Sequence, residues 1–269
     1  MDRLLVLKLD AQDCEAEAWL NGVPLARVDA ARPRAILPVH EYTLAGANQL
    51  ELVIWPRPAV TPAKPVLPGE PRVGDAKRAA ALRILLPRIG SPADEATART
   101  LAQLDWAPAE GVVYAAPLTL AHEVALPVTF PRWRWLDAPI TELTPVLHQQ
   151  ALAFVQALAQ ELAAGETDRY LSAVRLRTEE IAIAYQRQPA DEAGRLREHL
   201  LALHGAGLLN WAPLAAEGFF LRTVAGGRLL ECLDASGQPA LRTLPDAQGR
   251  TLALGLRLAA VDGKLYVLR

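Results

Sequence analysis

The chain has 269 residues, of which 51% are hydrophobic, and 28 Lys and Arg face 30 Asp and Glu, for a formal net charge of −2. This composition supplies enough apolar surface for one large core or two smaller ones, and the length favours two domains. Like charges are not clustered, which excludes the basic patches with which proteins bind nucleic acid.

No targeting or membrane segment is predicted. The first apolar stretch lies between Arg3 and Lys8 and is too short for the apolar region of a signal peptide. No apolar run approaches the roughly 20 residues that span a bilayer. We therefore expect a cytoplasmic protein without membrane insertion, in which Cys14 and Cys232 are buried, reduced thiols. The preference for Arg over Lys is typical of a GC-rich bacterial genome.

Residues 1–137 read as an all-β sandwich, because short apolar runs alternate with Pro, Gly and Asn and no helical period is sustained. Leu50, Leu52 and Ile54 alternate with Gln49, Glu51 and Val53, the two-residue period of a half-buried strand. Strands are predicted at residues 4–9, 14–20, 23–28, 34–38, 49–54, 79–86, 112–115 and 118–128.

Two segments interrupt this pattern of strands. Residues 56–71 contain six prolines and predict a stiff surface loop, since proline fixes φ and lacks an N–H group. Residues 91–104 predict a helix within the sandwich, with Ser91 as N-cap, Pro92 at the first helical position, and Asp94 and Glu95 in the first turn.

Residues 138–269 predict an α+β domain of three helices and an antiparallel sheet. The helices are expected at residues 145–165, where Thr144 is the N-cap, at 167–188, and at 191–204. Strands follow at 219–224, 228–233, 252–258 and 264–268. Gly226-Gly227 and Asp262-Gly263 predict hairpin turns, which need positive φ at their central residues.

Two motifs of the N-terminal half carry a family resemblance. Trp19-Leu20-Asn21-Gly22 and Gly46-Ala47-Asn48-Gln49-Leu50 resemble the paired strand signatures of galactose-binding-like jelly rolls, including the sugar-binding domain of family-two glycoside hydrolases. The resemblance implies a jelly-roll-like sandwich, a fold that in those enzymes often serves as a scaffold. The order of helices and sheet in the C-terminal half is similar to nuclear-transport-factor-two-like (SnoaL-like) domains, and no catalytic residue is transferred from them.

The most unusual segment is Phe130-Pro131-Arg132-Trp133-Arg134-Trp135. If it is extended, Trp133 and Trp135 share one face, and Arg132 and Arg134 share the other. The tryptophans then have two alternative roles. Exposed, they form a protein-binding hot spot or stack on a sugar; buried, they seal the boundary between the two domains.

A second candidate site lies at the edge of the sandwich, where Trp19, Asn21, His40 and Glu41 could orient a ligand. No metal site or cofactor is predicted, because the five histidines lack ligand spacing and no nucleophile elbow, phosphate loop or Cys-x-x-Cys pair occurs. Glu179-Glu180 is expected to be a solvated acidic pair.

The leading hypothesis from the sequence is a non-enzymatic bacterial interaction protein of the adaptor, assembly or immunity type, with another protein as its partner. It follows from a β-sandwich, a balanced charge and the absence of catalytic motifs. The alternatives are a carbohydrate-recognition module that binds a glycan, and a cone-shaped α+β domain that binds or converts a small molecule.

Overall fold

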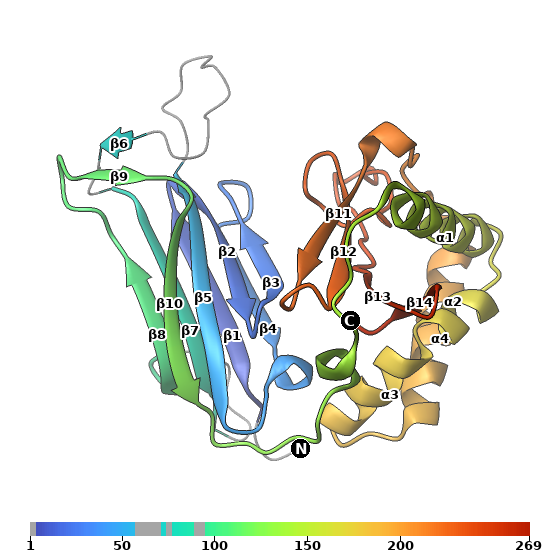
Figure 1. Cartoon of the computed structure of the whole chain (residues 1–269), viewed down its shortest axis with the longest axis horizontal. Coiled ribbons are helices and arrows are strands. Elements are labelled where there is room, and N and C mark those ends of the chain that lie inside the picture. Colours follow the sequence, from blue (N-terminus) through green and yellow to red (C-terminus); the bar gives the residue numbers. More distant parts are fainter. Residues whose placement is uncertain (1–3, 57–70, 74–76, 89–94) are drawn as a thin grey trace. The chain divides into compact units, whose positions relative to one another are not determined.

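The computed structural model describes residues 4–56, 71–73, 77–88 and 95–269. Contacts between Cα atoms divide the chain into two compact units, residues 1–132 and 133–269 (Figure 1). The chain is mostly β with some helices. The two-domain organisation with a boundary at residue 137 stays a prediction. Within the described ranges, no helix is long and apolar enough to cross a membrane.

The first unit is built from antiparallel strands. Two four-stranded sheets have the orders β4-β1-β7-β8 and β10-β5-β2-β3, and β6 pairs with β9 in a separate ribbon. The strands are β1 Val6–Gln12, β2 Cys14–Leu20, β3 Val23–Val28, β4 Arg34–Pro38, β5 Ala47–Pro56, β6 Pro71–Val73, β7 Ala79–Leu86, β8 Arg99–Trp106, β9 Val113–Ala115 and β10 Leu118–Ala125. The sequence prediction is confirmed residue for residue in β2, β3, β4 and β7.

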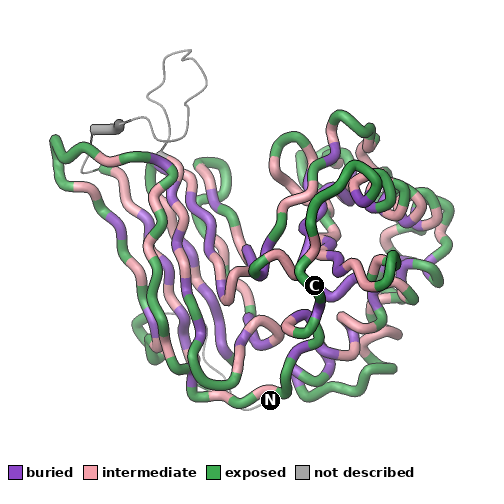
Figure 2. Tube along the Cα trace, viewed as in Figure 1, coloured by how far each residue is buried: buried purple, intermediate pink, exposed green. Residues whose placement is uncertain are grey.

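One core lies between the two four-stranded sheets. Leu50, Leu52 and Ile54 are fully buried, as the period of two in β5 predicts. They belong to the same apolar cluster as Leu7 and Leu82 of the other sheet. Figure 2 shows this alternation of buried and more exposed residues along the strands. Each of the two sheets therefore contributes one face to this core.

Two predictions for this unit need comment. The helix expected at 91–104 is wrong over residues 95–104: residues 95–98 form turns and a bend, and residues 99–104 lie in β8. There Ala102, Leu104 and Trp106 alternate with Gln103 and Asp105, a strand period that the capping signals upstream obscured. Residues 91–94, and the proline-rich loop from 57 to 70, lie outside the described residues.

The second unit combines helices with one antiparallel sheet of order β11-β12-β13-β14. Its core packs apolar residues of α1, such as Val155 and Leu158, against Leu230 and Leu258 of the sheet. The elements are α1 Pro145–Ala163, α2 Asp168–Ala173, α3 Arg175–Ala184, α4 Pro189–Gly205, β11 Phe219–Val224, β12 Leu229–Asp234, β13 Arg257–Val261 and β14 Lys264–Val267. Among the described residues, 3-10 helices lie at η1 His40–Tyr42 in the first unit and at η2 Arg134–Asp137 and η3 Ala216–Gly218 in the second.

Four helices stand where the sequence predicts three. The N-cap of α1 is confirmed, because Leu147 N donates a hydrogen bond to Thr144 Oγ1 at 3.2 Å. The second predicted helix is interrupted at Val174, whose ψ of 5° departs from the helical value. Hydrogen bonds continue across the interruption, from Val174 N to Tyr170 O and from Thr178 N to Val174 O. The apolar stripe alone did not reveal this local change of dihedral angle.

Candidate functional site

Trp133 and Trp135 are buried, with exposed fractions of 1% and 2%. Trp133 is extended, whereas Trp135 lies in η2, so the two rings do not follow the alternation of a strand. The Arg269 guanidinium lies 5.4 Å from the centroid of the Trp133 ring, in a cation–π contact. Burial excludes the exposed arrangement in which the pair would stack on a sugar. The alternative role, in which the two tryptophans seal the boundary between two domains, stays a prediction.

Arg134 and Glu180 connect this segment to α3. Arg134 N donates to Glu180 Oε1 at 2.7 Å, and the Arg134 guanidinium donates to Glu179 Oε2 at 2.8 Å. The other Glu180 oxygen accepts a hydrogen bond from Arg269 Nη1. Glu180 is only 4% exposed, so the expected solvated acidic pair is wrong for this residue. A buried carboxylate needs an opposite charge, and Arg269, which supplies it, is distant in sequence.

At the predicted sandwich-edge site, Asn21 bonds to the chain itself. Its Nδ2 donates to Asn48 Oδ1 and to Tyr42 O, both at 2.8 Å, and its Oδ1 accepts from Gln49 N at 2.9 Å. Asn21 and Gly22 have φ values of 54° and 73°, the positive pair that an Asn-Gly hairpin turn requires. The two motifs that carry the jelly-roll resemblance are thus joined through Asn21, by a side-chain bond to Asn48 and by bonds to Gln49.

His40 is also part of the framework. It is 2% exposed, and its Nε2 accepts a hydrogen bond from Leu5 N at 2.8 Å, so the imidazole is neutral with its proton on Nδ1. Trp19 is half-buried and donates from Nε1 to Glu17 Oε2 at 3.0 Å. Glu41 is half-buried in η1. Asn21 and His40 thus bond to backbone groups of the chain, and the ligand site at this edge stays a prediction.

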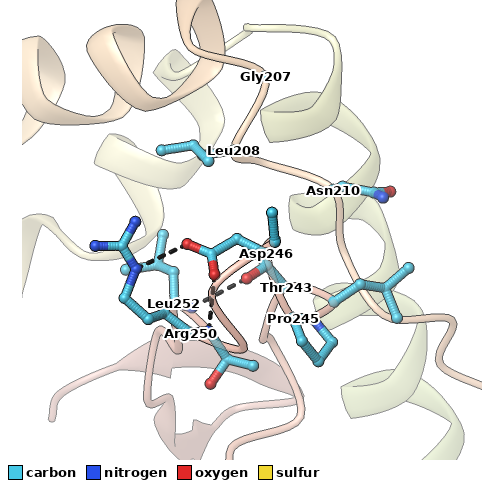
Figure 3. Close-up of a pocket in the computed structure, with 11 residues that line it drawn as sticks. Gly207, Leu208, Asn210, Thr243, Pro245, Asp246, Arg250 and Leu252 are labelled. Carbon is cyan, nitrogen blue, oxygen red and sulfur yellow. Dashed lines mark hydrogen bonds and ion pairs between the residues drawn. The ribbon is translucent and has the colours of Figure 1, made fainter.

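A hollow of about 570 Å³ lies in the second unit and was not predicted (Figure 3). One wall is the chain at residues 207–210, directly after α4. Gly207 has a φ of 68° and its N–H donates to His204 O at 2.9 Å, which ends the helix. The other wall is the hairpin at residues 243–252, and Leu244 N donates to Asn210 O at 2.8 Å to join the two walls.

The tip of this hairpin is fixed by Asp246. Its Oδ1 accepts from the N–H groups of Gln248 and Arg250, and its Oδ2 accepts from Arg250 Nε at 2.9 Å. The backbone N–H of Arg250 is the largest influence that lowers the pKa of Asp246, and the Arg250 guanidinium and Gln248 N–H add to it. Gly249 completes the turn with a φ of 74°. The carboxylate therefore stabilises the turn. The dashed lines in Figure 3 mark its interactions with Arg250.

The same turn occurs earlier in the chain. Asp234 Oδ1 accepts from the N–H groups of Ser236 and Gln238, and Arg242 Nε donates to Asp234 Oδ2 at 2.6 Å. Gly237 has a φ of 72°. Asp234-Ala-Ser-Gly and Asp246-Ala-Gln-Gly are thus a short internal repeat. The spacing of Asp and Gly was the signal that could have revealed it.

The walls of the hollow combine exposed apolar side chains with a few polar ones. Leu208 and Leu244 are 40% and 43% exposed, although both are large apolar residues. Asn210 is exposed, and its side-chain amide makes no hydrogen bond within the part of the chain that the structure describes. Asp246 and Arg250 neutralise each other in an ion pair. Besides this ion pair, the lining offers apolar contact, the Asn210 amide and the hydroxyls of Thr243 and Thr251.

No family model, curated protein or solved structure matches this chain. The resemblances to galactose-binding-like jelly rolls and to nuclear-transport-factor-two-like domains stay predictions that rest on the residues quoted above.

Proposed function

We propose that this chain is a non-enzymatic interaction protein of a bacterial cytoplasm, acting as an adaptor, assembly or immunity-type partner of another protein. The observation that carries the proposal is the hollow, where Leu208 and Leu244 stay exposed on two walls held by backbone hydrogen bonds. Exposed apolar side chains on a fixed frame are typical of protein-binding surfaces.

Three side chains of types that could perform catalysis have structural partners. His40 accepts from a backbone N–H, Glu180 is paired with Arg269, and Asp246 closes a turn. Burial raises the pKa of the Cys232 thiol strongly, and the Glu231 charge raises it further, so the reactive thiolate is disfavoured. Both cysteines are free and buried, which confirms that expectation.

The alternative functions have less support. A carbohydrate module needs exposed aromatic rings, and Trp133 and Trp135 are buried. A small-molecule site inside the α+β unit needs space between α1 and the sheet, where Val155, Leu158 and Leu230 belong to one apolar cluster. We also propose the finer architecture, a jelly-roll-like sandwich domain followed by an α+β domain.

Photo-crosslinking in the native host tests the proposed function. A photoreactive amino acid at Leu244 should give an adduct of one defined mass, and Leu208→Asp on the opposite wall should abolish it. The matched control places the same probe at Leu201, an exposed leucine of α4 outside the hollow. Adducts that form equally from Leu201, or none from Leu244, would contradict the proposal.

A further inference from the structure

The charges that line the hollow of the second unit are satisfied within the chain. Among the described residues of the lining, only Asp246 and Arg250 are charged, and Arg250 Nε lies 2.9 Å from Asp246 Oδ2. The other carboxylate oxygen accepts two backbone N–H groups, and Arg250 Nη2 donates to Gln248 Oε1 at 3.0 Å. A charge that leaves water needs a counter-charge, and this lining has none to spare. The hollow therefore suits an uncharged occupant.

One wall of the hollow presents an open amide beside an apolar side chain. Leu208 and Asn210 are exposed, whereas Leu209 between them is buried. This alternation is typical of extended chain, in which side chains two residues apart point to the same side at a spacing of about 7 Å. The Asn210 amide makes no hydrogen bond in the described chain, so its donors and its acceptor are open. Figure 3 shows this wall facing the hairpin that carries Pro245 and Asp246.

The hairpin wall adds apolar contact at a fixed distance. Leu244 is 43% exposed, and Pro245 lines the hollow beside it. Thr251 is exposed in the same lining and contributes a hydroxyl group. Because Leu244 N donates to Asn210 O at 2.8 Å, the apolar side chain and the amide keep their places relative to each other.

We propose that the hollow binds an extended, uncharged segment of a partner protein, with an aliphatic side chain between Leu208 and Leu244 and a peptide group paired with the Asn210 amide. A peptide group offers one N–H and one C=O, which complement the acceptor and donor of an asparagine side chain. Extended chain also repeats with the spacing of Leu208 and Asn210, so one segment can make both contacts. The inference rests on the proposed protein-binding function and specifies what the partner presents.

The probe is a displayed library of random peptides of about seven residues, selected on the full chain. Counter-selection on Leu208→Asp removes peptides that bind elsewhere. The selected peptides should share a stretch that contains an aliphatic residue and lacks Asp, Glu, Lys and Arg, and their binding should change little with salt. A shared charged residue, or binding that falls steeply with salt, would overturn the inference.

Asn210→Leu gives a test whose sign separates the two kinds of contact. It removes the donor and the acceptor but enlarges the apolar surface at nearly the same size. If the amide pairs with a peptide group, this variant should bind the selected peptides about tenfold more weakly; stronger or unchanged binding would overturn the inference. Gln149→Leu, at an exposed glutamine of α1 outside the hollow, is the matched control and should bind as the natural chain does.

The paired peptide group can be located on the peptide itself. Replacing one peptide bond at a time by an ester removes a single N–H group. At one position this change should weaken binding to the natural chain about tenfold and weaken binding to Asn210→Leu much less. Equal losses for both proteins at every position would contradict a bond to Asn210.

Failure of this inference differs from failure of the proposed function. If the probe at Leu244 gives its adduct in the host and Asn210→Leu does not lower the yield, the function stands and the inference fails. Dimers of the natural chain that Leu208→Asp abolishes would also overturn the inference, since the occupant would then be a second copy. If no peptide is selected and Leu244 gives no adduct, both fail.

Discussion

Asn48, which belongs to one of the two motifs that carry the jelly-roll resemblance, is a structural anchor. It is 1% exposed, and its Nδ2 donates to Leu44 O and Gly46 O. Its Oδ1 accepts from Leu44 N at 2.7 Å and from Asn21 Nδ2. All the hydrogen-bonding positions of the amide are therefore occupied by the chain.

We expect Asn48→Ala to lower the free energy of unfolding by about 2 kcal/mol, because buried partners lose their hydrogen bonds. Urea unfolding measures the change. Gln49→Ala is the control, since its exposed side chain makes no hydrogen bond among the described residues and should change stability little. A loss for Asn48→Ala no larger than that for Gln49→Ala would show that the amide network is not important for stability.

The buried pair of Glu180 and Arg269 makes a different prediction. Arg269→Met or Glu180→Met alone should cost about 3–5 kcal/mol, because each removes this ion pair and leaves the other charge buried. The double variant should be more stable than the sum of the single losses predicts. Thermal unfolding of the four proteins measures the coupling. Additive losses would mean that the two side chains act independently.

At the scale of elements, the two Asp-x-x-Gly turns fix the hairpins of the second unit. Burial raises the pKa of Asp234, but hydrogen bonds from Ser236, Gln238 and Arg242 outweigh it and lower the pKa below its ordinary value of 3.8. The ionised carboxylate is therefore the form that the folded chain stabilises. The contribution of Asp234 to stability is complete above its unfolded pKa and is lost as the pH falls through its folded pKa.

Asp234→Asn should accordingly make the free energy of unfolding less dependent on pH in the acidic range. We expect the natural chain to lose stability between about pH 5 and pH 3, and the variant to lose less over that range. Urea unfolding at a series of pH values tests this. The control is Asp262→Asn in the β13–β14 turn, where φ is 49° and the side chain makes no hydrogen bond in the described chain. A profile for Asp234→Asn as steep as that of the control would contradict the prediction.

The elements also show what the sequence could predict. Local signals located β2, β3, β4 and β7, because apolar alternation and turn residues lie within a few residues of each other. The same signals were misleading at β8, where good capping residues precede a strand that is defined by pairing with β7. The burial of Trp133 depends on contacts such as Arg269, far away in sequence, and the hollow depends on how residue 210 meets residue 244. Neither has a local signal.

At the scale of the whole molecule, the two hydrophobic cores do not share residues. Every residue of one apolar cluster lies within 1–132, and every residue of the other lies within 133–269. Each unit therefore has its own hydrophobic core, which is what allows a domain to fold alone.

We expect residues 1–132 and residues 133–269, produced separately, each to unfold in one cooperative transition. Circular dichroism during urea unfolding tests this, with the full chain as the control. A fragment that shows no transition would mean that its core depends on the rest of the chain, and the predicted two-domain organisation would then be wrong.

The Asn21-Gly22 turn also affects the chemical stability of this protein. Asparagine followed by glycine loses ammonia readily, because the next backbone nitrogen can attack the side-chain carbonyl. In the folded chain, the bonds to Tyr42, Asn48 and Gln49 hold that amide in place; an unfolded chain lacks this restraint. Deamidation would replace the Asn21 amide by a carboxylate. That carboxylate would face Tyr42 O and Asn48 Oδ1, two hydrogen-bond acceptors, and it could donate to neither. A molecule that spends time unfolded thus acquires a chemical mark at the residue that joins its two strand motifs.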